Sequence, residues 1–235
     1  MLYKKTSYKK QIEALSEISQ AISSDHYLDD ILKLIVTVTA NVMDSKICSL
    51  WILDEKEKVL RIRATQTMSE EYLKERVLKL GEGIVGHVAQ QNKPLAIQNV
   101  LKEPLYKEKE LAKKEGLVSM LSVPLTVKDR AIGVINCYTS YPHEFTETER
   151  AVLIAVASQA AICIENTELM VKTKVIQEEL ETRKLLERAK GVLMKNHSLD
   201  EEEAFKRIRK ASMDSRKTMR EIAEAILLAD KMGGK

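Results

Sequence analysis

The chain has 235 residues, of which 44% are hydrophobic and 31% are charged, and its formal net charge is +3. This composition is typical of a folded globular protein, and the length suits one medium domain plus a small one. No apolar run reaches the ~18 residues of a transmembrane helix, and the basic start of the chain lacks the apolar segment of a secretory signal, so we expect no membrane partner.

Two amphipathic helices are predicted at the start of the chain. Residues 10–22 place Ile12, Leu15, Ile18 and Ile22 at helical spacing, and residues 28–43 do the same with Ile31, Leu32, Ile35, Val38 and Val42. Residues 46–53 and 59–65 follow as two strands of an antiparallel pair, because Leu60, Ile62 and Ala64 alternate with arginines.

The next segments alternate between helix and strand. Gly81 and Gly83 predict a turn before a short helix that begins near Ile84, and Pro94 ends that helix ahead of a brief strand. A charged helix near 105–115 precedes strands at 117–127 and 131–140, which the turn Lys128–Arg130 separates. This order predicts an α+β fold, an antiparallel sheet with helices packed on its faces.

From Thr146 onward the pattern predicts one long helix. No Gly or Pro occurs from Glu144 to Lys190, so the helix can run for about 45–50 residues. Its apolar positions step as in a coiled coil through Ala160, Ile164, Thr167 and Val171, and then shift to Val175, Ile176, Leu180 and Leu186. Because one small domain cannot bury such a stripe, we expect a parallel homodimer.

The last part of the chain predicts three short helices around one small core. Ser198 and Glu201 have the spacing of a capping box that starts the second helix, which turns Ala204, Phe205, Ile208 and Ser212 inward. A break at Met213–Arg216 precedes a third helix, with Met219, Ile222, Ala223, Ile226 and Leu227 on one face. From Arg183 onward there are 14 Lys or Arg against 9 Asp or Glu. This basic excess suggests a polyanion-binding end.

The motif Arg183-x-x-Leu186-Glu187-x-Ala189-Lys190-Gly191-x-Leu193-Met194, followed by Glu203-Ala204-Phe205, Ile208-Arg209 and Ile222-Ala223, closely resembles the ANTAR domain of bacterial transcription antiterminators. The resemblance covers nearly all of residues 181–227. It implies a module that binds RNA carrying paired hairpins, generally as a dimer, and so favours antitermination.

The preceding part resembles a GAF domain. The matching motifs are Gly81-x-Gly83-Ile84-Val85-Gly86, Ser119-Met-Leu-Ser-Val-Pro-Leu125, Ile132-Gly133-Val134-Ile135, and Phe145-Thr-x-x-Glu149 leading into Ala157 to Asn166. The resemblance implies a signal-responsive regulator. We expect a GAF-like sensor at 1–165, a coiled-coil linker at 166–182 and an ANTAR-like RNA-binding domain at 183–231.

RNA offers phosphates to cationic side chains and splayed bases to polar ones. The residues that we expect at the RNA interface are Arg183, Lys190, Gly191, Lys195, Arg209, Ser212, Arg216, Lys217 and Thr218. Gly191 weakens its own helix, so it indicates a close approach, of the third helix in preference to RNA. Phe205 is predicted to be core, so aromatic stacking on bases is not expected.

In the sensor domain, an unknown small molecule is expected against the inward residues Trp51, Ile62, Ile84, Val85, Met120 and Val123, which could equally be plain core. Whether a cofactor binds is unknown from the sequence. His87 lacks partners at metal-ligand spacing, and no metal site is expected. Cys48, Cys137 and Cys163 are odd in number and widely spaced among apolar residues, which predicts buried thiols in a reducing cytoplasm.

Two alternative functions remain. A basic three-helix module can resemble a DNA-binding helix-turn-helix. Some GAF domains are enzymes that reduce methionine sulfoxide with clustered cysteines, whereas the cysteines here lie 89 and 26 positions apart. No catalytic constellation of other residues is recognisable, so we expect no enzyme activity.

Overall fold

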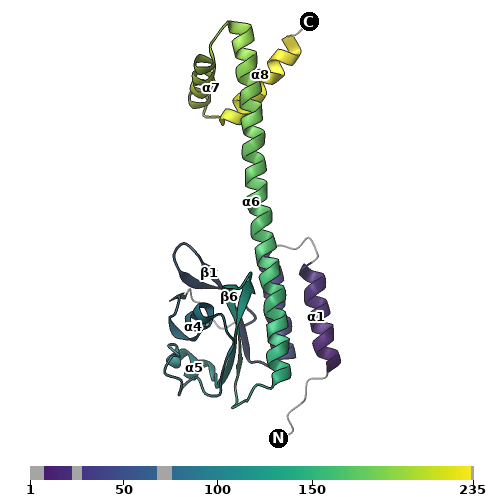
Figure 1. Ribbon diagram of the computed structural model, residues 1–235, viewed down its shortest axis with the longest axis vertical. Coiled ribbons are helices and arrows are strands. Elements are labelled where there is room, and N and C mark those ends of the chain that lie inside the picture. The colour runs from purple at the N-terminus through teal and green to yellow at the C-terminus, as the bar shows by residue number, and fades with distance from the viewer. Residues whose placement is uncertain (1–7, 23–27, 68–75, 234–235) are drawn as a thin grey trace. The chain divides into compact units, whose positions relative to one another are not determined.

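The computed structural model describes residues 8–22, 28–67 and 76–233. The chain divides into two compact units, residues 1–167 and 168–235, and one long helix belongs to both. The first unit is an antiparallel sheet with helices on both faces, and the second is helical (Figure 1). The predicted α+β fold is confirmed.

The sheet has six strands in the spatial order β3-β2-β1-β6-β5-β4, with antiparallel neighbours. Both predicted strand pairs are confirmed. The short β3 was not expected, since three residues give no alternating pattern. The strands are β1 Ile47–Asp54, β2 Val59–Thr65, β3 Val77–Lys79, β4 Leu95–Ile97, β5 Ser119–Val127 and β6 Arg130–Thr139.

The turns follow from the backbone that each residue can adopt. Lys128 and Asp129 both have positive φ, 48° and 63°, as a two-residue hairpin turn requires, so Arg130 already belongs to β6. Gly81 and Gly83 have φ of 83° and 62°, which confirms that turn geometry accounts for them.

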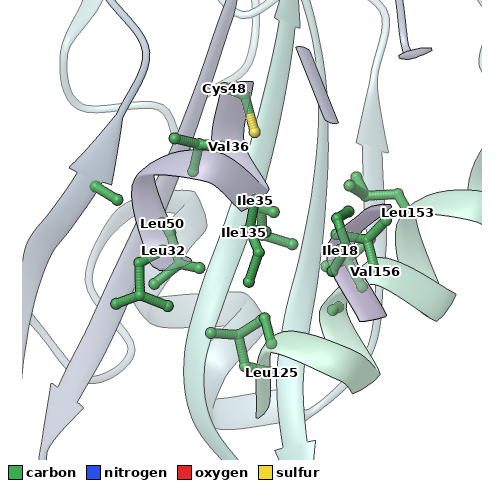
Figure 2. Close-up of a cluster of buried hydrophobic side chains, with 14 of the residues drawn as sticks. Ile18, Leu32, Ile35, Val36, Cys48, Leu50, Leu125, Ile135, Leu153 and Val156 are labelled. Carbon is green, nitrogen blue, oxygen red and sulfur yellow. The ribbon is translucent and has the colours of Figure 1, made fainter. Parts of the chain in front are cut away.

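One face of the sheet is covered by α1 (Tyr8–Ile22), α2 (Leu28–Val42) and the first part of α6 (Glu147–His197). Their apolar side chains interlock with those of the strands in one core (Figure 2). The predicted face of the first helix was partly wrong. Ile12 is 68% exposed, whereas the predicted Ile18 is buried together with Gln11 and Ala14. The side chain of Ile22 lies outside the described residues.

The opposite face carries α4 (Gly83–Gln91) and α5 (Lys109–Glu115) over a second core cluster. A Cβ at Gly86 would lie 2.3 Å from the carbonyl oxygen of Lys79, so only glycine lets α4 approach the end of β3 this closely. The predicted charged helix begins later than expected, because the backbone turns at Glu103–Tyr106 before it.

The long helix α6 is confirmed and runs for 51 residues. Ala160 and Ile164, which were expected to face a partner helix, are buried in the core of their own unit. The helix contains an 18-residue window long and apolar enough to cross a membrane, but 39% of that window is buried inside the fold.

The second unit adds α7 (Glu201–Ser215) and α8 (Met219–Gly233) to the end of α6. Its core consists of Ala189, Leu193, Ala204, Ile208 and Ala223, with partly buried leucines, isoleucines and Met219 around them. The third predicted helix and its inward face are confirmed, while the second helix continues to Ser215 and ends at Arg216 in left-handed conformation.

Two details of this unit differ from prediction. The capping box is formed by Asp200 and Glu203, because Ser198 has a φ of 54° and cannot take the extended backbone that an N-cap needs. Phe205 is 41% exposed. Ala204 and Ile208, one turn apart, already fill the small core, and Phe205 lies about 100° around the helix from Ala204.

Candidate nucleic-acid interface and sensor face

The basic side chains of the second unit present an accessible surface. Arg183 and Lys195 lie on α6, Arg209 lies on α7, and Arg216 and Lys217 lie in the turn between α7 and α8. All five are exposed, and no ion pair within 4 Å is formed by any of them in the described parts of the chain. Their charges are therefore available to an anionic ligand. We call these five residues the basic surface.

The turn between α7 and α8 brings four predicted residues together. The Ser212 hydroxyl donates to the carbonyl of Lys217 at 2.6 Å, and the amide of Lys217 donates to the carbonyl of Ser212 at 3.2 Å. The Thr218 hydroxyl donates to Glu221 at 2.8 Å and caps α8. Because the hydroxyl hydrogens of Ser212 and Thr218 are used inside the turn, these residues position Arg216 and Lys217.

Lys190 occupies a different kind of site from the one predicted. Only 8% of the surface of Lys190 is exposed, and its ammonium group lies 2.6 Å from Glu201 and 2.9 Å from Glu187. The hydrogen bonds to Glu201 and Glu187 raise the pKa of Lys190, and the hydrogen bond from Lys190 lowers the pKa of Glu201. Lys190 thus ties α6 to the first turn of α7, and we omit it from the basic surface.

Gly191 is exposed, and a Cβ at this position would meet no atom within 4 Å. The expectation that it makes room for the third helix was wrong.

We predict that Gly191→Ala raises the free energy of unfolding by about 0.5–1 kcal/mol, because alanine is the better helix former and the space is open. Denaturant unfolding followed by far-UV circular dichroism measures this change. A lower unfolding midpoint in the variant would contradict it.

Five of the six predicted sensor residues lie together. Trp51, Ile84, Val85 and Met120 are buried in the cluster beneath α4 and α5, with Ile62 partly buried against it. Val123 lies in the cluster on the other face of the sheet, so its assignment to this site was wrong. Side chains alternate along a strand, and positions 120 and 123 point to opposite faces.

A row of buried polar side chains crosses three strands beside these apolar residues. Asn136 on β6 pairs with Ser49 on β1 and with Ser122 on β5. The Ser122 hydroxyl donates to Asn136 Oδ1 at 2.7 Å, while the Asn136 amide nitrogen is fully buried without a hydrogen-bond partner. On this face, the guanidinium of Arg76 lies 5.4 Å from the centre of the Trp51 ring, and its Nη1 donates to both carboxylate oxygens of Glu108.

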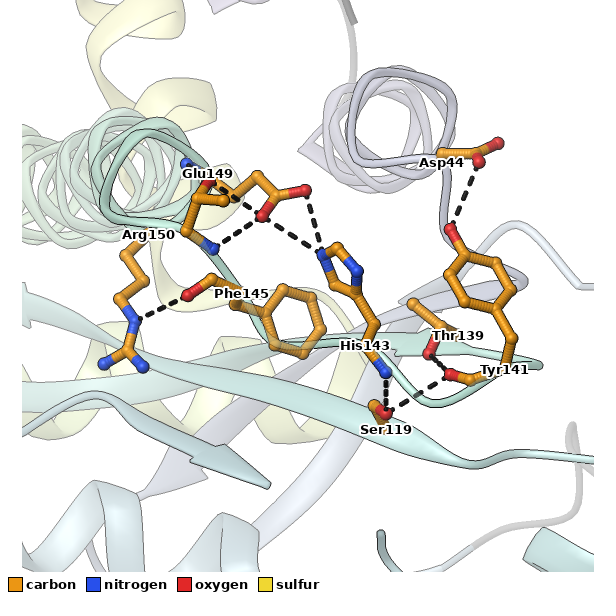
Figure 3. Close-up of polar contacts among 9 residues, drawn as sticks. Asp44, Ser119, Thr139, Tyr141, His143, Phe145, Glu149 and Arg150 are labelled. Carbon is orange, nitrogen blue, oxygen red and sulfur yellow. Dashed lines mark hydrogen bonds and ion pairs between the residues drawn. The ribbon is translucent and has the colours of Figure 1, made fainter. Parts of the chain in front are cut away.

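A serine, a histidine and a glutamate meet at the start of α6 without forming a nucleophilic triad (Figure 3). Ser119 Oγ donates to the carbonyl of Gln98 and accepts from the backbone amide of His143. The His143 ring instead contacts Glu149 at 3.0 Å, and Glu149 also caps the helix through Thr146. The cluster therefore anchors α6. Within residues 8–22, 28–67 and 76–233, no group of three or more His, Cys, Asp or Glu could hold a metal ion.

The structure brings together two cysteines that are far apart in sequence. Cys48 and Cys137 are direct partners on β1 and β6, with their sulfur atoms 3.8 Å apart. Both lie on the face covered by α1, α2 and α6, as does the buried Cys163. Sequence spacing could not show this pair, because only the strand order places β6 beside β1.

We predict that Cys48 and Cys137 in the native chain react slowly with a thiol reagent at pH 8. Burial raises the pKa of Cys48, so the reactive thiolate is scarce at this pH. All three thiols should react rapidly once guanidinium unfolds the chain, as read from absorbance with Ellman's reagent. Rapid native labelling of Cys48 or Cys137, identified by peptide mass, would contradict the buried pair.

Comparisons with known proteins agree with this architecture. The GAF domain profile matches residues 25–165, and the ANTAR domain profile matches residues 174–227. The chain belongs to the GAF domain family, and an ANTAR domain follows its GAF domain.

Individual relatives each match one part of the chain. The transcriptional regulatory protein PdtaR of Mycobacterium tuberculosis is 40% identical over 90 residues, 38% of this chain and 42% of that protein. A phosphoenolpyruvate-dependent phosphotransferase system protein of Escherichia coli is 26% identical over 155 residues, 66% of this chain but only 21% of its own length. The solved GAF domain of a Coxiella burnetii phosphoenolpyruvate-protein phosphotransferase shares the fold, with a TM-score of 0.64 and 24% identity over 70% of this chain and 98% of that one.

Proposed function

We propose that this chain is a cytoplasmic, signal-responsive transcription antiterminator that binds hairpin-containing leader RNA as a dimer. The observation that carries the proposal is the basic surface, five exposed cations without ion-pair partners in the described residues, on a module that matches the ANTAR domain. Exposed Gly191 would let an RNA strand approach α6. The division into a sensor at 1–165, a linker at 166–182 and an RNA-binding domain at 183–231 belongs to the same proposal.

The exposed apolar residues of α6 support the dimer. Ile162, Leu169 and Ile176 recur every seven residues, Leu180 follows four residues later, and each is 48–57% exposed. A repeat of seven is the pattern of a left-handed coiled coil. We call these four residues the α6 seam. A second copy of the chain would cover it, and the seam differs from the predicted line through Ala160 and Ile164.

The sensor face supplies the regulatory input of the proposal. A small molecule bound beneath α4 and α5 would favour one packing of the paired α6 helices, which sets the spacing of the two RNA-binding modules. A coupling free energy of about 1–3 kcal/mol would change RNA affinity roughly 5- to 150-fold.

Two alternative functions have less support. A methionine sulfoxide reductase needs cysteines that reach a substrate, whereas Cys48 and Cys137 are buried on the face of the sheet that α1, α2 and α6 cover. A DNA-binding regulator would need α7 or α8 in the major groove with exposed base-reading side chains. The ANTAR domain profile that matches residues 174–227 favours RNA over DNA as the ligand.

A competition between nucleic acids tests the proposal. The full chain is offered a pool of RNAs carrying two hairpins with randomised loops, together with a randomised duplex DNA pool of equal length. We expect enrichment of particular RNA hairpin loops at 150 mM salt. Enrichment of a DNA sequence in place of RNA would overturn the proposal.

A further inference from the structure

The second unit contains a groove of about 620 Å³, and of the residues in the basic surface only Arg183 lines it. Its walls come from α6, from α7 and from the start of α8. Its volume falls within the range of about 300–1,000 Å³ that is typical of small-molecule sites. The lining residues are Val175, Glu178, Glu179, Thr182, Arg183, Leu186, Glu187, Lys190, Phe205, Thr218, Met219 and Arg220.

Phe205 is an aromatic side chain in this groove that is left partly exposed to solvent. It is the one aromatic residue in the sequence from 168 to 235, and 41% of its surface is exposed. Leu186 and Met219 line the groove with it and are only partly buried. Leaving an aromatic ring in water costs free energy that a flat apolar partner would recover by stacking.

The charges around the groove indicate which flat partner fits. Glu178, Glu179 and Glu187 line it and would repel a phosphate. Of the three cations, Lys190 is ion-paired with Glu187 and Glu201, and Arg220 with Glu181 and Glu224. Arg183 alone has no ion pair in the described part of the chain. The groove therefore suits an uncharged ring with polar edges better than it suits a phosphate.

We propose that this groove receives one unstacked base of the RNA hairpin loop, which stacks on Phe205 and presents its edge to Arg183 and the groove carboxylates. The inference rests on the proposed function and adds how the loop is recognised. A guanidinium can bond or stack on a base, and a carboxylate can accept a hydrogen bond from an exocyclic amino group.

The test uses the full chain and the RNA hairpin selected in the competition above. We expect Phe205→Ala to weaken binding roughly 5- to 150-fold, the range for loss of one stacked base, while the dependence on salt stays unchanged because no phosphate contact is lost. Phe205→Tyr should retain most of the affinity. Met213→Ala is the matched control, because Met213 is also on α7 and is 63% exposed, and it should bind as the unmodified chain does.

A second measurement needs no variant. Removing the base at each loop position in turn, with the sugar and phosphate retained, should weaken binding by the unmodified chain at one position. Phe205→Ala should be insensitive to that same removal. Equal binding by Phe205→Ala and the unmodified chain would overturn the base site and leave RNA binding standing, whereas failure of the unmodified chain to bind RNA would overturn the proposed function. A shift of Phe205→Ala toward monomer in sedimentation without RNA would show that a second copy occupies the groove.

Discussion

We expect a chain carrying Ile176→Glu and Leu180→Glu to sediment as a monomer at a micromolar concentration at which the unmodified chain forms the proposed dimer. Both residues belong to the α6 seam and are more than half exposed in a single chain. In a parallel dimer, each glutamate would lie against its own copy on the partner, so two pairs of like charges would be desolvated together. This combination disfavours association strongly.

The matched control for this variant is Val171→Glu. Val171 is 60% exposed on the same helix, but the repeat of seven places it on the side away from the α6 seam. The control should remain a dimer. If the unmodified chain is a monomer, or if the control dissociates as fully as the double variant, the proposal that the α6 seam holds a dimer is contradicted.

We expect alanine at Lys195, Arg209, Arg216 and Lys217 to weaken RNA binding on the order of 100-fold or more near 100 mM salt, because each cation that binds a phosphate would release about one counterion. The slope of log affinity against log salt should fall in magnitude by about three, at roughly 0.7–0.9 per phosphate contact. Fluorescence anisotropy with the selected hairpin at four salt concentrations gives both quantities.

A control with the same net charge separates location from charge. Alanine at Lys33, Lys93, Lys102 and Lys107 removes four exposed lysines from the sensor unit. This control should keep the affinity and the salt slope of the unmodified chain. If both variants lose RNA affinity equally, binding depends on the total positive charge of the chain and not on the basic surface.

Much of the fold was predictable because local patterns agree with the tertiary structure. Period-two alternation in residues 59–65 predicted β2, and the absence of Gly and Pro predicted α6. The misses arise where tertiary packing decides between equivalent local choices. Ile12 and Phe205 were predicted on the same helix faces as Ile18 and Ala204, but only Ile18 and Ala204 are buried.

The candidate sites were predictable only in part. Charge excess and motif spacing identified the basic module, but Lys190 looks like any other lysine in the sequence until Glu201 is brought beside it by the fold. The pairing of Cys48 with Cys137 and the buried amide of Asn136 likewise depend on the strand order. Only the alternation rule, applied to positions 120 and 123, could have corrected Val123 from sequence.

Transcription through a terminator tests most directly whether the chain is an antiterminator. The selected two-hairpin sequence is placed so that its second hairpin overlaps a terminator stem, and single-round transcription is measured with increasing amounts of the full chain. If the chain is an antiterminator, full-length transcript should rise with the unmodified chain and should not rise with the alanine variant of Lys195, Arg209, Arg216 and Lys217. Termination that stays constant while the unmodified chain saturates the RNA would contradict it.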